Sequence, residues 1–336
     1  MKRCVRCIIP SCFPGVSFNE QDLCNYCARY EEAREKRDEE RQKFERRFLE
    51  LLETVPRGSN YDCLMAYSGG KDSSYTLLSM KQRFGLRVLA LTFDNGFLPA
   101  ATLENIMKVV EGVGVDYMLV KPDFSLMRKI FVAAATTSLY PRKTVERAST
   151  ICTSCIAFVK FVSLRVAIEQ SIPFMVFGWS PGQVSGSSPI FKTNPMIIRS
   201  MQRVLYAPLH RVAGDAINPY FLEEKHFEKR EGFPYSISPL SFMEYDEDKV
   251  LREISTYGWR RPEEVDPNST NCLINSFANR LHFQQYGYNP YVFELAKLVR
   301  EGYLEREDAL LRVEHPGDRA TTETVRERLG LPPIGN

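Results

Sequence analysis

The sequence predicts an α/β protein whose central sheet is parallel. From residue 61 onward, short apolar runs of strand length alternate with segments that suit helices. Such alternation indicates βαβ units, which place helices on the faces of a parallel sheet. A glycine-rich, charged turn follows the first apolar run, and past about residue 240 the pattern becomes mostly helical. We therefore expect a sheet domain over 58–240 and a helical C-terminal domain over 241–336.

The individual elements follow in chain order. Strands are expected over 61–67, 87–94, 116–122 and 173–180. A helix is expected over 73–84, and further helical segments are expected before the third and fourth strands. C-terminal helices are expected over 246–258, 274–287, 290–302 and 305–314.

A charged helix precedes the sheet domain. Residues 29–53 contain no glycine or proline, and their charges alternate in sign. Apolar side chains, among them Phe48 and Leu51, gather toward the end of this stretch. The pattern predicts an exposed linker helix within 29–57 that packs through its C-terminal half.

The first 28 residues carry two cysteine pairs. Cys4 and Cys7 are two residues apart, Cys24 and Cys27 likewise, and 16 residues separate the pairs. Two knuckles at this spacing suit a tetrahedral Zn²⁺ site. Four thiolates leave no open coordination position, so we expect a structural zinc that orders the segment 1–28. Cys12 lies between the pairs and is not assigned.

The turn after the first strand, SGGKDSS, has the composition of a polyphosphate site. It consists of Ser68, Gly69, Gly70, Lys71, Asp72, Ser73 and Ser74. Ligands of parallel sheets bind beyond the carboxyl ends of strands, where helix amides and the helix dipole face an anion. The glycines let the backbone curl closely, the lysine supplies positive charge, and the serines supply hydroxyls. The turn matches neither the Walker pattern nor the dinucleotide fingerprint.

The six residues SGGKDS resemble the PP-loop of the ATP pyrophosphatase superfamily, whose motif is S-G-G-x-D-S. The resemblance implies a HUP-like fold that binds ATP and Mg²⁺ and splits ATP into AMP and pyrophosphate. A substrate carbonyl oxygen would be adenylated and then displaced, with Lys71 and Asp72 as catalytic residues. The nucleotide contacts that the resemblance implies at later strand ends are Phe93, Asp94, Asn95 and Gly178.

Both ends of the chain resemble the N-acetyl sugar amidotransferase family. The resemblance covers the segment CVRCIIPSCFPGVSFNEQDLCNYCARYE at the start and the helical tail over 271–314. In that family, ammonia from a glutaminase partner displaces AMP. This chain shows no recognisable glutaminase domain, so such a partner would be a separate protein.

Three central cysteines depart from that family. Cys152 and Cys155 form a C-x-x-C ahead of an expected helix, and Cys272 lies far along the chain. The set resembles the PP-loop sulfur transferases that make 2-thiouridine and 2-thiocytidine in tRNA, in which three cysteines hold a [4Fe-4S] cluster. Three ligands leave one iron open, which could present hydrosulfide to the adenylated carbon. The alternatives are persulfide chemistry, a second zinc site completed by His282 or Cys12, and buried structural cysteines.

These resemblances define two enzymatic hypotheses and one that is not enzymatic. The favoured hypothesis is an AMP-forming sulfur transferase, and its alternative is an amidotransferase of surface polysaccharide synthesis. A nucleotide-binding regulator without activity is disfavoured, because the SGGKDS motif is intact.

Composition sets the remaining expectations. The formal net charge of +2 over 336 residues argues neither for nor against a nucleic-acid partner. No apolar run approaches membrane-spanning length and the start lacks a secretion signal, so we expect a cytoplasmic protein without a membrane partner. Basic stretches over 142–150, 199–211 and 225–232 could meet phosphate groups, but the lack of a separate RNA-binding module slightly favours a small-molecule substrate over tRNA. A sulfur-carrier partner and a homodimer are compatible with this interpretation.

Overall fold

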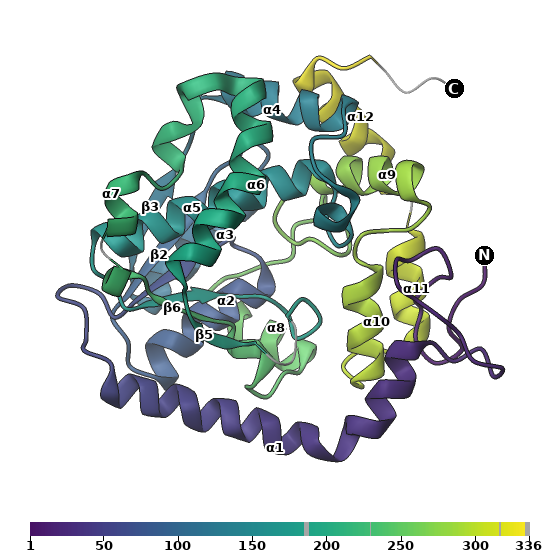
Figure 1. Cartoon of the computed structure of the whole chain (residues 1–336), viewed down its shortest axis with the longest axis horizontal. Helices are drawn as coiled ribbons and strands as arrows, with labels where there is room; N and C mark the ends of the chain where they lie inside the picture. Colours follow the sequence, from purple (N-terminus) through teal and green to yellow (C-terminus); the bar gives the residue numbers. More distant parts are fainter. Residues whose placement is uncertain (185–187, 229, 316, 333–336) are drawn as a thin grey trace.

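The computed structural model describes residues 1–184, 188–228, 230–315 and 317–332, and within them a six-stranded sheet is covered by helices (Figure 1). The strands are β1 (Cys63–Ala66), β2 (Val88–Phe93), β3 (Asp116–Val120), β4 (Phe174–Phe177), β5 (Ile190–Lys192) and β6 (Tyr235–Ile237). Their order is β3-β2-β1-β4-β6-β5, and only β5 is antiparallel to its neighbour. The predicted fold class, an α/β protein with a mostly parallel sheet, is confirmed.

Strand β1 occupies the middle of the sheet. Its Leu64 aligns with Leu89 of β2 on one side and with Met175 of β4 on the other. Every residue of β2 and β4 is buried, as parallel strands covered on both faces require. After β3 the chain crosses to the opposite side of β1 and forms β4. The carboxyl end of β1 therefore lies at the point where the strand order reverses, which is the preferred ligand position in such sheets.

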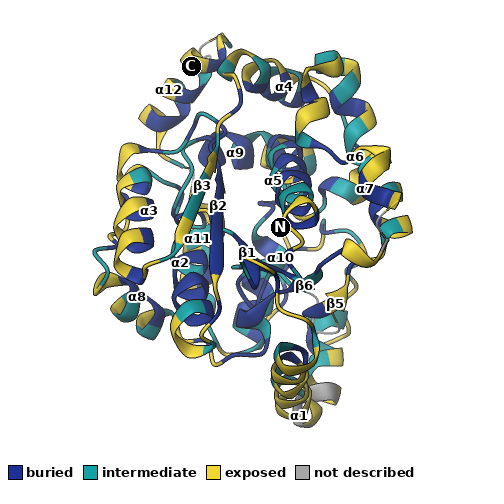
Figure 2. Cartoon of the chain, turned by 90° about the vertical axis from the view of Figure 1, so that its left-hand side faces the viewer, coloured by how far each residue is buried: buried dark blue, intermediate teal, exposed yellow. Residues whose placement is uncertain are grey.

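Helices form an apolar layer on each face of the sheet (Figure 2). One layer contains α2 (Lys71–Leu78), α3 (Ala100–Val113) and α8 (Glu247–Ser255). The other contains α4 (Phe124–Thr136), α5 (Thr150–Glu169), α6 (Pro195–Ala213), α7 (Glu224–Glu228), α9 (Ile274–Tyr286) and α12 (Arg319–Leu329). Short 3₁₀ helices lie at Arg142–Val145, Gly214–Tyr220, Arg230–Gly232 and Pro239–Ser241.

The helix predicted over 73–84 is longer than expected at its start. It begins at Lys71 and continues beyond Leu78 as a π-helix over Ser79–Arg83. Lys71 and Asp72, which were assigned from the sequence to the turn before the helix, therefore lie in the first turn of the helix itself.

Helix α5 is the one helix among the described residues that is long and apolar enough to cross a membrane. This finding corrects the expectation that no apolar segment approaches that length. In the structure α5 is a core helix, because it packs against β1, β2 and β4 and against α4, α6 and α9. Ser149 caps it by accepting a hydrogen bond from the amide of Cys152. Cys152 and Cys155 consequently lie inside its first two turns, not ahead of it as expected.

The N-terminal segment is joined to the sheet by α1 (Asn25–Thr54), a helix of 30 residues. The helix begins earlier than predicted because the sulfur of Cys24 caps it, accepting a hydrogen bond from the amide of Cys27. Phe48 and Leu51 in its second half join the apolar layer beneath the sheet, as predicted. Helices α10 (Val292–Arg300) and α11 (Arg306–Glu314) pack against the cysteine segment at the other end of α1 (Figure 1).

Several elements were not expected from the sequence. Strands β5 and β6 have three residues each, too few to establish a period-two pattern. Helices α6, α7 and α12 were also missed. Helix α6 has a proline inside it, at Pro208, which argues against a helix when the sequence is considered alone.

Candidate functional site

The glycine turn closes tightly around the carboxyl end of β1. Gly69 has a φ of +75°, and a Cβ at this position would lie 2.6 Å from the Ile106 side chain. Both its conformation and its surroundings therefore require glycine. The carbonyl oxygen of Gly69 accepts a hydrogen bond of 2.9 Å from the indole nitrogen of Trp259. The amide of Lys71 donates to the hydroxyl of Thr270 at 3.2 Å, so segments far along the chain hold the turn.

The three serines of the turn have different surroundings. The hydroxyl oxygens of Ser68 and Ser73 lie 3.0 Å apart, and that of Ser73 also donates to the carbonyl of Gly70 at 3.0 Å. The hydroxyl of Ser74 lies 3.1 Å from that of Tyr67, and Ser74 is completely buried. Ser68 and Ser73 thus hydrogen-bond to each other within the turn, whereas Ser74 faces the core.

Lys71 and Asp72 belong to a network of charged and phenolic groups. The ammonium of Lys71 lies 2.8 Å from a carboxylate oxygen of Asp72 and donates to the hydroxyl of Tyr245 at 2.7 Å. Tyr245 in turn donates to Asp72 at 2.9 Å, and burial together with the charge of Asp72 raises the pKa of Tyr245 well above its usual value. Glu247 lies 3.9 Å from the same ammonium. Burial by itself would raise the pKa of the Glu247 carboxyl group. The positive charges of Lys71 and Arg312 have the larger combined effect, so the pKa is lowered.

The predicted nucleotide contacts at the later strand ends occupy the same edge of the sheet. Asp94 is almost fully buried, accepts a hydrogen bond of 2.8 Å from the amide of Gly96, and pairs with Lys121 at 3.0 Å. The ring of Phe93 stacks on Phe158 in the core, so it contributes packing there. Gly178 lies directly against the turn, because a Cβ on it would be only 2.4 Å from the Cα of Ser73.

The three central cysteines converge beside this edge. The amide nitrogen of Asn95, just after β2, lies 3.4 Å from the sulfur of Cys155 and 3.6 Å from that of Cys272. The distance between the sulfur atoms of Cys155 and Cys272 therefore cannot exceed the sum of these two distances. Cys152 receives a hydrogen bond of 3.8 Å from Asn275. Residues from α5, from α9 and from the segments that follow β2 and precede α9 thus build one thiol group. Sequence reasoning identified its cysteines but not the role of Asn275.

Burial dominates the chemistry of these thiols. It raises the pKa of Cys152 to about 12 and also raises the pKa values of Cys155 and Cys272. Free thiols in such surroundings stay protonated at neutral pH, whereas a bound metal displaces the proton. Among the described residues, only the N-terminal cysteines lie close enough together to share a single ion.

The four N-terminal cysteines form a compact, fully buried group. Their sulfur atoms all lie within 4.8 Å of one another. The Cys4–Cys27 and Cys7–Cys24 sulfur distances are 3.7 and 3.8 Å. Tetrahedral zinc with bonds of about 2.3 Å places its ligand sulfurs about 3.8 Å apart, which is the spacing of these two pairs.

Helices α10 and α11 support this centre with arginines. Arg300 is buried and donates to the sulfur of Cys7 at 3.6 Å. Arg306 donates to the main-chain carbonyl of Cys7 at 3.2 Å. Four thiolates around Zn²⁺ would carry a net negative charge, which these cations would offset. The predicted knuckle is therefore attached to the C-terminal helices and not exposed as a separate lobe.

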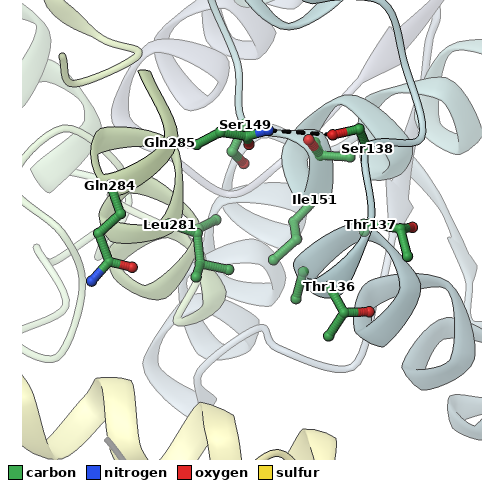
Figure 3. A pocket seen from close by; sticks show the side chains of 12 residues that line it. Thr136, Thr137, Ser138, Ser149, Ile151, Leu281, Gln284 and Gln285 are labelled. Carbon is green, nitrogen blue, oxygen red and sulfur yellow. Dashed lines mark hydrogen bonds between the residues drawn. The ribbon is translucent and has the colours of Figure 1, made fainter. Parts of the chain in front are cut away.

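A separate cavity of about 360 Å³ lies between the end of α4, the start of α5 and α9 (Figure 3). Hydroxyl groups of Thr136, Ser138 and Ser149 and the side-chain amide of Gln285 line it, together with alanine, leucine and isoleucine. Gln285 donates to Ser138 at 3.4 Å across this cavity. None of the central cysteines lines it, so we do not include it in the candidate site.

The geometry of the whole site is typical of one class of proteins. A glycine–serine turn at the switch point of a parallel sheet, opening a helix and carrying a lysine, is an anion-binding arrangement of nucleotide-binding α/β proteins. The thiol group lies at the same edge, connected to it through the segment that follows β2.

Comparison with known proteins gives distant similarities. No family model matches the chain. An uncharacterized protein of Methanocaldococcus jannaschii is 24% identical over 280 residues, which are 82% of this chain and 80% of the relative. The U34-tRNA thiolase NcsA from Methanococcus maripaludis, solved with its [4Fe-4S] cluster, aligns at 18% identity and a TM-score of 0.39, covering 94% of this chain and 90% of that one. A predicted tRNA methyltransferase subunit from M. jannaschii aligns at 17% identity and a TM-score of 0.30, covering 69% of this chain and 90% of that one.

Proposed function

We propose that the protein is a PP-loop enzyme that adenylates a carbonyl or amide oxygen with ATP and then replaces this oxygen with sulfur. One observation carries the proposal: the SGGKDS turn and three partly buried cysteines meet at one edge of the sheet, where the strand order reverses. The turn supplies the nucleotide site, and the cysteines supply the sulfur chemistry.

The turn is suited to the triphosphate of ATP. The amides at the start of α2 and the helix dipole favour negative charge at this point. Lys71 already lies in the site, and in the absence of a ligand its charge is balanced by Asp72 and Glu247. Mg²⁺ would screen the phosphates further. The loop amides and Lys71 would stabilise the charge that develops on the departing pyrophosphate.

Adenylation makes the subsequent displacement feasible. A carbonyl oxygen leaves poorly because it would depart as hydroxide or oxide. After transfer of AMP the same oxygen departs as part of a phosphate, which is a stabilised leaving group. The nucleophile then needs only to be held close to the activated carbon.

The thiol group favours a cluster over persulfide chemistry. A persulfide mechanism requires a thiol that ionises near neutral pH, whereas burial raises the pKa of all three cysteines. Cys152, Cys155 and Cys272 would hold a [4Fe-4S] cluster, which supplies an iron with an open position for a sulfur ligand. Asn95 and Asn275 already donate hydrogen bonds to the sulfurs, as groups around such clusters do.

The experiment is anaerobic purification followed by iron, sulfide and zinc analysis and a pyrophosphate-release assay. We expect about four irons and one zinc per chain. Pyrophosphate release should require sulfide and an acceptor, tested with N-acetylated sugar nucleotides, amide-bearing small molecules and undermodified tRNA. We put a small-molecule acceptor first, and activity with tRNA alone would correct this choice.

Two variants provide the control. Cys155→Ala should lose iron and product formation while it keeps ATP binding. Cys12→Ser changes a cysteine outside both groups and should keep the iron and the activity. A colourless protein that holds only zinc and releases pyrophosphate only with ammonia would overturn the sulfur-transfer proposal in favour of an amidotransferase.

A further inference from the structure

One acidic side chain near the nucleotide turn has no role in the scheme above. Glu294 lies in the first turn of α10, and one of its carboxylate oxygens accepts a hydrogen bond of 2.7 Å from the hydroxyl of Ser180. Ser180 follows β4 and lies two residues beyond Gly178, which packs against the nucleotide turn. Glu294 is thus brought to the nucleotide turn by the C-terminal part of the chain.

The loop that carries Ser180 is firmly held against α10. The ammonium of Lys297 donates to the carbonyl oxygens of Pro181 and Val184, both at 2.6 Å. A Cβ on Gly182 would lie 2.6 Å from the carbonyl oxygen of Glu294, so helix and loop are in direct contact. Glu294 therefore occupies a defined position and does not sample the solvent as a surface glutamate does.

Charged and titratable groups face Glu294 from several elements. They are Lys71 and Asp72 of α2, Arg147 ahead of α5, Tyr245 ahead of α8, and Tyr291 from its own segment. Tyr291 is also close to Cys152, as the charge of that thiol contributes to the raised pKa of Tyr291. Glu294 and Cys152 are thus both neighbours of Tyr291.

These surroundings allow the carboxyl group to exchange a proton at neutral pH. Burial raises the pKa of Glu294 to about 7, the hydrogen bond from Ser180 works in the opposite direction, and Asp72 raises it further. Lys71 and Arg147 lower it. A carboxyl group with a pKa near the working pH is suited to general acid–base catalysis.

We propose that Glu294 is the general base of the adenylation step, accepting the N–H proton of an amide-type acceptor. The acceptor oxygen forms a bond to the α-phosphorus of ATP, and the bond from this phosphorus to the bridging oxygen breaks to release pyrophosphate. The electron pair of the N–H bond forms the C=N bond of the adenylated intermediate, and the proton passes to the carboxylate oxygen of Glu294. This step rests on the proposed function, but it is the same whether sulfur or nitrogen later displaces AMP.

Nucleotide binding should therefore be coupled to proton uptake at Glu294. The triphosphate brings negative charge toward the carboxylate and draws Lys71 to the phosphates, and both changes favour the protonated carboxyl group. Isothermal titration of Mg²⁺ and a non-hydrolysable ATP analogue, in buffers that differ in ionisation enthalpy, measures the protons taken up. No acceptor is needed, so this measurement is independent of the sulfur chemistry.

The expected result is a difference between the wild type and Glu294→Gln near pH 7. The glutamine keeps the shape and can still accept from Ser180, so nucleotide binding persists while the Glu294 contribution to proton uptake is lost. Any proton that the γ-phosphate of the nucleotide gains or loses on binding is the same for both proteins. This contribution therefore cancels when their proton uptakes are subtracted. Glu104→Gln, an exposed glutamate on α3, is the matched control and should behave as the wild type.

A second variant keeps the test decisive if Glu294→Gln folds poorly. Ser180→Ala removes a hydrogen bond that favours the charged carboxylate, so the pH of maximum proton uptake should move upward. Equal proton uptake by wild type, Glu294→Gln and Ser180→Ala at every pH would overturn the assignment.

Turnover gives an additional readout once an acceptor is found. Pyrophosphate release in the wild type should rise with pH through a value above about 7, because bound nucleotide raises the pKa of Glu294 further. In Glu294→Gln it should fall by about 10²–10⁴ and lose this dependence. A wild type that binds nucleotide with the predicted proton uptake but releases no pyrophosphate would reject the proposed function and not the position of Glu294. Active wild type with an equally active Glu294→Gln would reject the general base.

Discussion

The contact between Gly178 and Ser73 leads to a quantitative prediction for Gly178→Ala. The added Cβ would lie 2.4 Å from the Cα of Ser73 and 2.9 Å from both its amide nitrogen and its Cβ. All three of these Ser73 atoms belong to the main chain or are bonded directly to it, so no side-chain rotation relieves the overlap. The end of β4 and the start of α2 must therefore separate until the shortest contact exceeds about 3 Å.

Overpacking of this kind costs about 1–3 kcal/mol of folding free energy. If part of this strain is relieved by opening the nucleotide turn, the affinity for ATP falls by about tenfold to a hundredfold, since each 1.4 kcal/mol corresponds to about tenfold. Urea unfolding measures the first quantity, and calorimetric titration with a non-hydrolysable ATP analogue measures the second.

Gly112→Ala is the matched control for this substitution. Gly112 lies in the last turn of α3, and its added Cβ would approach a ring carbon of Tyr257 at 2.9 Å, where a side chain can move aside. Replacing a helical glycine by alanine stabilises by about 0.5–1 kcal/mol, so this variant should be neutral or slightly more stable. An unfolding midpoint and a nucleotide affinity of Gly178→Ala that both match the wild type would refute the reasoning.

Three further predictions concern the charged network, the zinc centre and the pH dependence. Lys71→Ala and Asp72→Ala should each abolish pyrophosphate release while circular dichroism and the unfolding midpoint show an intact fold; turnover in either variant would contradict the nucleotide assignment. Removal of zinc by a strong chelator should increase hydrogen exchange in α10, because Arg300 connects this helix to Cys7; unchanged exchange would show that the centre does not support α10. The pKa of Glu294 is raised in the folded state, so its contribution to stability is present below about pH 4.5 and is lost as the pH rises through about 7. In the wild type, the resulting fall in the free energy of unfolding between pH 5 and 8 is at most about 3 kcal/mol. Urea unfolding at several pH values in this range should show that Glu294→Gln lacks this fall.

Local patterns were reliable where one segment contains the whole signal. The cysteine spacing within residues 4–27 predicted a compact four-sulfur group, and the sulfur distances of 3.7 and 3.8 Å fit it. The run CLMA followed by SGGKDS located both β1 and the turn. Such predictions succeed because spacing along a short segment limits the geometry that the segment can adopt.

Errors arose where local and distant influences compete. The sequence around Pro208 does not suggest a helix, yet α6 continues through it and buries Leu209 against the core. The C-x-x-C was expected ahead of a helix, but the cap at Ser149 draws Cys152 and Cys155 into the first turns of α5. A cap of this kind depends on one side chain, and several positions in the stretch could have provided it.

By itself, the sequence determined the parallel sheet, the position of the glycine–serine turn and the pairing of the N-terminal cysteines, because each depends on residues that are neighbours along the chain. Only the tertiary structure decided what surrounds the turn. Tyr245, Trp259 and Thr270 reach it from about 170 to 200 positions further along, and Glu294 comes from further still. No spacing rule links such distant residues, since their convergence is a consequence of how the C-terminal helices pack against the edge of the sheet.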